Sequence, residues 1–134
     1  LKARSAVRKP TVLTPHPLEA ARLLGTTAGQ VEGDRLAAAR TLAGRLGCVV
    51  VLKGSGTVLA APGELPRINP TGNARLATAG TGDVLAGLVA ARLAAGVPAM
   101  DAAADAVHAH GAAADAWPQG LPLVAGQLAG RLTA

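Results

Sequence analysis

The sequence predicts an α/β fold in which helices cover both faces of a mostly parallel sheet. The continuous apolar run Cys48–Leu52 is rich in valine, which is typical of a strand buried on both faces. Val84–Ala95 repeats its large apolar residues every three to four positions, the period of a helix with one buried face. Strand-like and helix-like segments alternate along the first half of the chain, as they do in folds with a parallel sheet.

The predicted elements are separated by glycine- or proline-rich breaks, which fix where each one ends. In chain order we expect a strand at Thr11–Thr14, a helix at Leu18–Leu24, a polar loop at Thr26–Gly33, a helix at Asp34–Leu46, the buried strand at Cys48–Leu52, its hairpin partner at Val58–Ala60, an edge segment at Arg67–Asn69, and helices at Val84–Ala95, Asp101–Trp117 and Leu123–Leu132.

The composition indicates one modest domain with a core of small side chains. Half of the 134 residues are hydrophobic, yet aromatic residues make up only 1%, with Trp117 as the single example. The net charge of +5 is spread out and is not interleaved with aromatic residues, which argues against a nucleic-acid partner and favours a phosphorylated small molecule. We expect a cytoplasmic protein without a membrane segment, because no apolar run approaches bilayer length and the single Cys48 cannot form an internal disulfide.

The stretch Asn69–Gly96 carries two glycine-rich turns, and the second, Ala79–Asp83, runs directly into a predicted helix. Unpaired N–H groups and the positive dipole end of such a helix suit an anion, usually a phosphate. Gly80 and Gly82 let the backbone approach a ligand closely. Asp83 fits two roles here, an N-cap or a catalytic base, and the extra turn upstream favours a site because one cap does not need it.

Two further polar turns follow predicted strands, at Pro15–Glu19 and Lys53–Thr57. Ligands of parallel sheets bind at the carboxyl ends of strands, so these turns belong to the same candidate site. Lys53 could reach a phosphate or simply extend to solvent. Glu19 could cap the following helix or help hold a metal with a phosphate. His16 could be a surface-turn histidine or a ligand contact.

Several common site types are absent from the sequence. The chain lacks the Walker A and GxGxxG patterns in their strand-to-helix context, and no serine stands in a nucleophile elbow. His108 and His110 flank Ala109 on a predicted helix, so they face different directions and make a poor metal pair. With a single cysteine besides, no zinc site is expected.

Taken together, the turns resemble those of the ADP/ATP-dependent NAD(P)H-hydrate dehydratases, members of the ribokinase-like superfamily. The Gly-Thr-Gly-Asp turn alone is shared across the superfamily, but the His-Pro turn and the Asn-x-Thr-Gly-Asn turn make the resemblance specific, and it extends over nearly the whole chain. It implies a ribokinase-like three-layer α/β/α fold. Residues 1–134 would then be a single partial domain, its C-terminal half, with the N-terminal half missing. The matching stretches are Leu13–Pro17 with Glu19, Val51–Thr57, Asn69–Asn73, Ala77–Gly87, and the tail around His108, Gly111 and Asp115.

The resemblance implies an enzyme that repairs hydrated NADH or NADPH (NADHX, NADPHX). ADP or ATP, with Mg²⁺, would phosphorylate the ring hydroxyl, and loss of phosphate would restore NAD(P)H. Asp83 would take the hydroxyl proton, His16 would contact the hydrated dinucleotide, and no residue would ligate the metal directly. The AMP part of the nucleotide would be held by Lys53, Gly54, Ser55, Gly56, Thr57 and Gly82, and phosphate and Mg²⁺ would be organised by Glu19, Asn69, Thr71, Asn73 and Gly80. A homo-oligomer is also implied.

The chain departs from the family pattern at Leu18 and Arg75, which stand at or near usual glycines beside the predicted site. Two alternative functions are open. A kinase of the hydroxymethylpyrimidine type shares the Gly-Thr-Gly-Asp turn but usually has asparagine where His16 stands, so His16-Pro17 favours the dehydratase. An inactive nucleotide-binding fragment is the other alternative, and the short length supports it.

Overall fold

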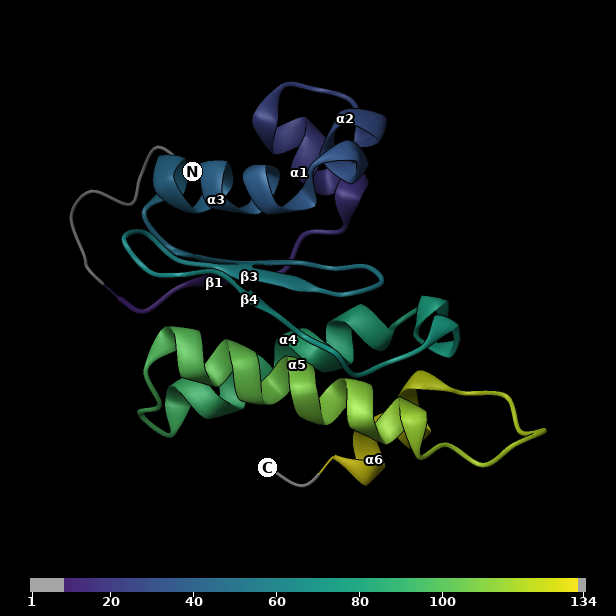
Figure 1. The fold of residues 1–134 in the computed structure, drawn as a ribbon. Coiled ribbons are helices and arrows are strands. Elements are labelled where there is room, and N and C mark those ends of the chain that lie inside the picture. The colour runs from purple at the N-terminus through teal and green to yellow at the C-terminus, as the bar shows by residue number, and fades with distance from the viewer. Residues whose placement is uncertain (1–8, 133–134) are drawn as a thin grey trace.

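The computed structural model describes residues 9–132, which form three layers (Figure 1). A four-stranded sheet in the order β1-β2-β3-β4 lies between two groups of helices. The strands are β1 (Val12–Leu13), β2 (Val49–Leu52), β3 (Val58–Ala60) and β4 (Arg67–Ile68). The helices α1 (Pro17–Leu24), α2 (Ala28–Gly33) and α3 (Arg35–Leu46) cover one face, and α4 (Thr81–Ala94), α5 (Ala99–Asp115) and α6 (Ala125–Arg131) lie on the other side, after the short 3₁₀ helix η2 (Ala74–Ala77).

Strand β2 is the centre of the core, because its side chains alternate between the two helical layers. Val50 and Leu52 pack with the layer of α1–α3, and Val49 and Val51 pack with α4 and α5. All four are nearly inaccessible to solvent. The prediction of a strand buried on both faces is therefore confirmed.

The α/β class is confirmed, but the strand pairing differs from the expected mostly parallel sheet. Among the described strands only β1 and β2 are parallel, with Val12 opposite Val49, while β2–β3 and β3–β4 are antiparallel. The connections explain the difference. The chain crosses from β1 to β2 through three helices, whereas short hairpin-like links join β2 to β3 and β3 to β4 and can only produce antiparallel neighbours.

The predicted polar loop at Thr26–Gly33 is wrong, because α2 occupies most of it. Thr27 is the N-cap: its Oγ1 accepts from the N–H of Gln30, and the Gln30 Oε1 accepts from the N–H of Thr27, each at 3.2 Å. This reciprocal capping box, together with the buried Val31, stabilises a short helix in a polar segment.

The other helices lie where the sequence predicts them, with shifted ends. Helix α4 begins at Thr81 rather than Val84, so the Thr-Gly-Asp sequence forms its first turn. Gly25 and Gly47 end α1 and α3 in left-handed conformation, with φ of 71° and 62°. No helix within residues 9–132 is long and apolar enough to cross a membrane.

Candidate functional site

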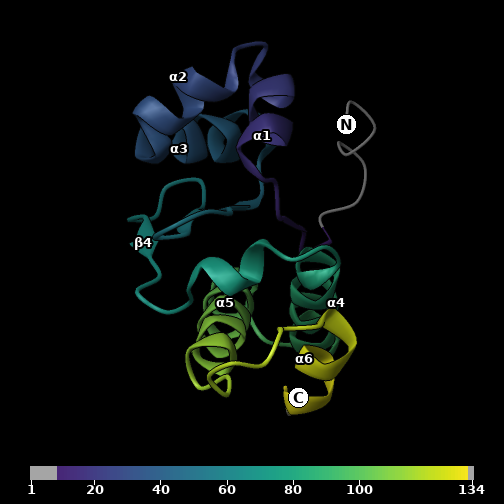
Figure 2. The same ribbon diagram turned by 90° about the vertical axis from the view of Figure 1, so that its right-hand side faces the viewer.

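Backbone hydrogen bonds join the polar turns to one another at one edge of the sheet. The N–H of Lys53, after β2, donates to the carbonyl of Pro15, after β1, at 2.9 Å. The N–H of Asn69 donates to the carbonyl of Thr57 at 2.9 Å. This edge lies on the right of Figure 1, where the β2–β3 turn, η2 and the start of α4 are seen together, and Figure 2 turns it toward the viewer.

The glycine-rich turn in which the sequence predicts an anion site forms the N-cap and first turn of α4. Gly80 is its N-cap, with φ of 86° and no side chain to bond the helix amides. Asp83 is therefore not the N-cap, and that alternative is wrong. Its side chain is exposed and makes no hydrogen bond or ion pair with any other residue of the described chain. An unengaged carboxylate at this position is available to accept a proton.

Lys53 extends from the end of β2 to the same helical turn. A Cβ atom placed on Gly82 would lie 3.0 Å from the Lys53 Nζ, so the ammonium group rests against the helix backbone where Gly82 has no side chain. The ammonium charge adds to the positive end of the α4 dipole. Of the two roles considered for Lys53, this position supports binding of an anion.

His110, on α5, contacts the first turn of α4 from the interior of the protein. It is 6% exposed, and its Nε2 lies 2.9 Å from the carbonyl oxygen of Thr81. Burial lowers the pKa of His110, and the positive charge of Lys53 lowers it further, against the opposing effect of the Thr81 hydrogen bond. His108 is exposed, so the prediction that the two histidines face different directions is confirmed.

The Asn69–Asn73 turn is docked on the C-terminal half of α5. The Asp115 carboxylate accepts from the N–H of Gly72 at 2.8 Å and from the Asn73 Nδ2 at 2.9 Å. The Asn73 amide also donates to the carbonyl of Ala114 at 3.0 Å. Asn73 is thus engaged in holding its loop, while its predicted place on the phosphate path stays a prediction.

Asn69 and Thr71 are engaged in the same way. The Asn69 Nδ2 donates to the Thr71 carbonyl at 2.8 Å, and the Thr71 Oγ1 lies 3.0 Å from the His108 carbonyl. The close approach depends on Gly111, where a Cβ atom would lie 2.2 Å from the Thr71 Oγ1. These side chains shape the loop that leads into η2 and α4.

His16 and Glu19 form a capping box at the start of α1. The N–H of His16 donates to the Glu19 Oε2 at 2.8 Å, and the N–H of Glu19 donates to the His16 Nδ1 at 3.2 Å. The capping alternative for Glu19 is therefore confirmed. Both side chains remain about half exposed, at 46% and 47%, so a ligand at this edge can reach them.

The sequence pattern of the NAD(P)H-hydrate dehydratase family matches residues 2–131. The chain belongs to this family. The ADP-dependent (S)-NAD(P)H-hydrate dehydratase of Neisseria meningitidis is 51% identical over 124 residues, which cover 92% of this chain and 42% of that protein.

Two solved structures share the fold of this chain over part of their length. The ADP/ATP-dependent NAD(P)H-hydrate dehydratase of Bacillus subtilis, co-crystallised with ATP and Mg²⁺, superposes with a TM-score of 0.82 at 36% identity, covering 91% of this chain and 45% of that one. A ribokinase-like superfamily protein of Enterococcus faecalis gives 0.79 at 31% identity, covering 96% and 45%. The fold is thus ribokinase-like, and this dehydratase-family chain spans less than half the length of these relatives.

Three residues with structural roles at the site were not found from the sequence as site residues. Asp115 holds the Asn69–Asn73 loop, Arg75 donates to the carbonyl of Trp117 at 3.1 Å, and Arg35 bonds the turn after β2. Each of these residues bonds a partner that lies far away in the sequence, so no local spacing pattern predicts the contact.

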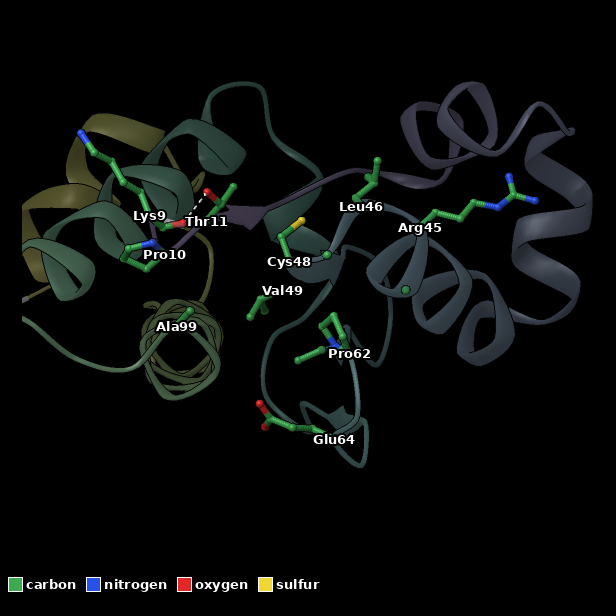
Figure 3. Close-up of a pocket in the computed structure, with 13 residues that line it drawn as sticks. Lys9, Pro10, Thr11, Arg45, Leu46, Cys48, Val49, Pro62, Glu64 and Ala99 are labelled. Atoms are coloured by element: carbon green, nitrogen blue, oxygen red, sulfur yellow. Dashed lines mark hydrogen bonds between the residues drawn. The ribbon is translucent and has the colours of Figure 1, made fainter. Parts of the chain in front are cut away.

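An open depression of about 430 Å³ lies beside the Asn69–Asn73 turn, and Asn73 and Asp115 are among the residues that line it. A depression of about 770 Å³ lies at the opposite end of the strands, next to Thr11 before β1 and Cys48 before β2 (Figure 3). Its lining combines apolar residues with the charged side chains of Lys9, Arg45 and Glu64, and none of the predicted site residues lines it. The depression therefore does not mark the predicted chemistry.

Proposed function

We propose that this chain carries the nucleotide-binding and catalytic residues of an ADP- or ATP-dependent NAD(P)H-hydrate dehydratase. The observation that carries the proposal is the contact of the Lys53 ammonium with Gly82, next to the unengaged carboxylate of Asp83 on the same helical turn. One turn then offers positive groups for a phosphate and a base beside them. The activities named for the Neisseria and Bacillus relatives support the same assignment.

In this proposal the nucleotide spans the β2–β3 turn and the start of α4. Residues 53–57 and Gly82 hold the AMP part. The N–H groups of Gly80 and Gly82, which donate to no other residue of the described chain, face the phosphates. Backbone N–H groups are fixed before the reaction, so they stabilise charge on a transferring phosphoryl group without reorganising. Lys53 adds a full positive charge at this point.

Asp83 acts as the general base. Its carboxylate takes the proton of the ring hydroxyl as the hydroxyl oxygen attacks the terminal phosphorus, and the bond from that phosphorus to the rest of the nucleotide breaks. The new C–O–P ester then loses phosphate by cleavage of its C–O bond, a ring proton leaves, and the dihydronicotinamide double bond is restored. His16, half exposed at the same edge, contacts the hydrated dinucleotide.

The residues fit a Mg²⁺ ion that is held chiefly by the nucleotide. Within residues 9–132 no group of three or more His, Cys, Asp or Glu side chains could hold a metal. Mg²⁺ commonly keeps several waters and binds through one or two carboxylates and substrate phosphates. Glu19 is the carboxylate that we assign to this ion, through water, and the ion would neutralise phosphate charge.

A chimera tests the proposal for this chain's own residues. Residues 1–134 replace the matching segment of the Neisseria dehydratase, which supplies the remainder of the relative's length. With ADP or ATP and Mg²⁺, we expect hydrated NADPH to regain the absorbance of NADPH. A phosphorylated product without that absorbance would favour the kinase alternative, and no nucleotide-dependent change would favour the inactive fragment. Sedimentation velocity of the same protein tests the expected homo-oligomer.

A further inference from the structure

Arg35, the first residue of α3, reaches across to the turn after β2 and bonds both of its sides. Its Nη2 donates to the carbonyl of Leu52 at 3.1 Å, and its Nη1 donates to the carbonyl of Ser55. The Arg35 side chain is only 15% exposed. A planar guanidinium can bond two carbonyl groups in one fixed geometry, which a lysine ammonium cannot do.

Gly54 makes this contact possible. A Cβ atom at position 54 would lie 2.6 Å from the Arg35 Nη2, closer than real side chains come, and Gly54 has φ of 146°. The guanidinium therefore packs directly against the backbone of the turn. The absence of a side chain at Gly54 therefore makes room for the Arg35 guanidinium, as it would for a ligand.

The carbonyl groups of the turn accept hydrogen bonds from within the protein, whereas its N–H groups are left free. The carbonyl groups of Leu52 and Ser55 accept from Arg35, and that of Gly54 accepts from the Thr57 Oγ1 at 3.1 Å. In contrast, the N–H groups of Gly54, Ser55 and Gly56 donate to no other residue of the described chain, and all three residues are exposed. Successive N–H groups left free in a turn form a concave site for an anion.

We propose that Arg35 is the positioning residue of this turn: it draws the carbonyl groups toward α3 so that the N–H groups stay open to the nucleotide. The role rests on the proposed function, in which residues 53–57 hold the AMP part. Arg35 itself is placed behind the turn and acts through it. Without the guanidinium, the carbonyl groups of Leu52 and Ser55 lose their donors, and the turn is free to present them to the ligand instead.

The test compares Arg35→Lys and Arg35→Gln with a matched control, Arg40→Gln, in the 134-residue chain. Arg40 is exposed on the same helix, and Arg40→Gln changes the net charge by the same amount as Arg35→Gln does. Backbone amide signals are followed by NMR, first without ligand and then during titration with Mg²⁺ and ADP. Circular dichroism verifies that each variant is folded.

We expect the free-state amide signals of Gly54, Ser55 and Gly56 to move in both Arg35 variants and to stay in place in Arg40→Gln. The affinity for ADP should fall about tenfold in Arg35→Gln, the equivalent of one or two lost hydrogen bonds, and by a smaller factor in Arg35→Lys. Equal affinity and unmoved signals in the Arg35 variants would overturn the proposal. If the unaltered chain does not respond to ADP, its nucleotide role is refuted, and the free-state signals alone then decide whether Arg35 positions the turn.

Discussion

The His110 Nε2–H donates a hydrogen bond of 2.9 Å to the carbonyl oxygen of Thr81, joining the buried face of α5 to the first residue of α4. A carbonyl oxygen only accepts, so the hydrogen lies on Nε2 in the neutral ring. Both residues joined by this bond are buried, whereas Asp83, two residues after Thr81, is exposed. The bond therefore supports the site from inside the protein.

This relationship predicts that acid weakens the fold through His110. Burial, and then the charge of Lys53, lower the pKa of His110 below its ordinary value of 6.5, so the unfolded chain binds this proton more readily than the folded one. The contribution is intact above pH 6.5 and is lost as the pH falls through the lowered pKa. Thermal unfolding at a series of pH values should show this loss in the unaltered chain and much less of it in His110→Gln.

His108 provides the control, because it is exposed on the same helix. His108→Gln should keep the pH dependence of the unaltered chain. If His110→Gln and His108→Gln gave the same profile, His110 would have no part in it.

Removing the Lys53 charge should raise the pKa of His110. The ammonium of Lys53 is one of the causes that lower this pKa, and it is lost in Lys53→Met. The measurement is an NMR titration of the His110 ring signal. Arg40→Gln, which removes an exposed charge from α3, should leave the titration unchanged. An unmoved His110 titration in Lys53→Met would show that the two groups do not interact.

Two glycine-to-alanine substitutions should have opposite effects on stability. At Gly111 an added Cβ atom meets the Thr71 hydroxyl at 2.2 Å and the Thr71 backbone at 2.7 Å, so Gly111→Ala should cost about 1–3 kcal/mol of unfolding free energy. At Gly87, on α4, an added Cβ atom meets nothing within 4 Å, so Gly87→Ala should add up to about 1 kcal/mol through helix propensity. Urea unfolding measures both. A stabilised Gly111→Ala variant would show that the loop does not dock on α5 as described.

The sequence predicted most of the fold because most elements carry their own local signals. The valine run of β2 and the apolar period of α4 needed no tertiary information. Helix α2 carries a Thr27–Gln30 capping box in its sequence, but the polar composition of Thr26–Gly33 is also typical of a loop, so composition alone does not predict this helix. The hairpin partner of β2 at Val58–Ala60 is confirmed. The mostly parallel sheet is not, because two hairpin-like links and one helical crossover join the described strands.

The glycine-rich turns of the candidate site could be predicted from local sequence patterns. The residues that hold these turns in place through tertiary contacts could not. The glycines and Asp83 are typical of a helix start, so the sequence could place the beginning of α4 near Gly80 and predict an anion site there. The contacts of Asp115 with Gly72 and of Arg35 with Ser55 join segments that only the fold brings together. The bond from the Asn73 amide to the carbonyl of Ala114 on α5 is likewise a tertiary contact, and the role of Asn73 on the phosphate path stays a prediction.

The central claim concerns Asp83 and is tested by two substitutions of aspartate by asparagine in the chimera that carries residues 1–134. Asp83→Asn keeps the shape of the side chain and removes the proton acceptor, while Asp105→Asn changes an exposed aspartate of α5 and serves as the control. General-base catalysis is worth about 100- to 10,000-fold in rate. Nucleotide binding should survive in both variants, because the Lys53–Thr57 turn is untouched.

The decisive measurement is the rate at which NADPH absorbance returns from hydrated NADPH with ADP or ATP and Mg²⁺. We expect Asp83→Asn to lose at least about 100-fold in this rate while it still binds the nucleotide, and Asp105→Asn to keep the full rate. If Asp83→Asn recovered NADPH at the full rate, Asp83 would not be the base. The interpretation of the α4 turn as the catalytic centre would then be contradicted as well.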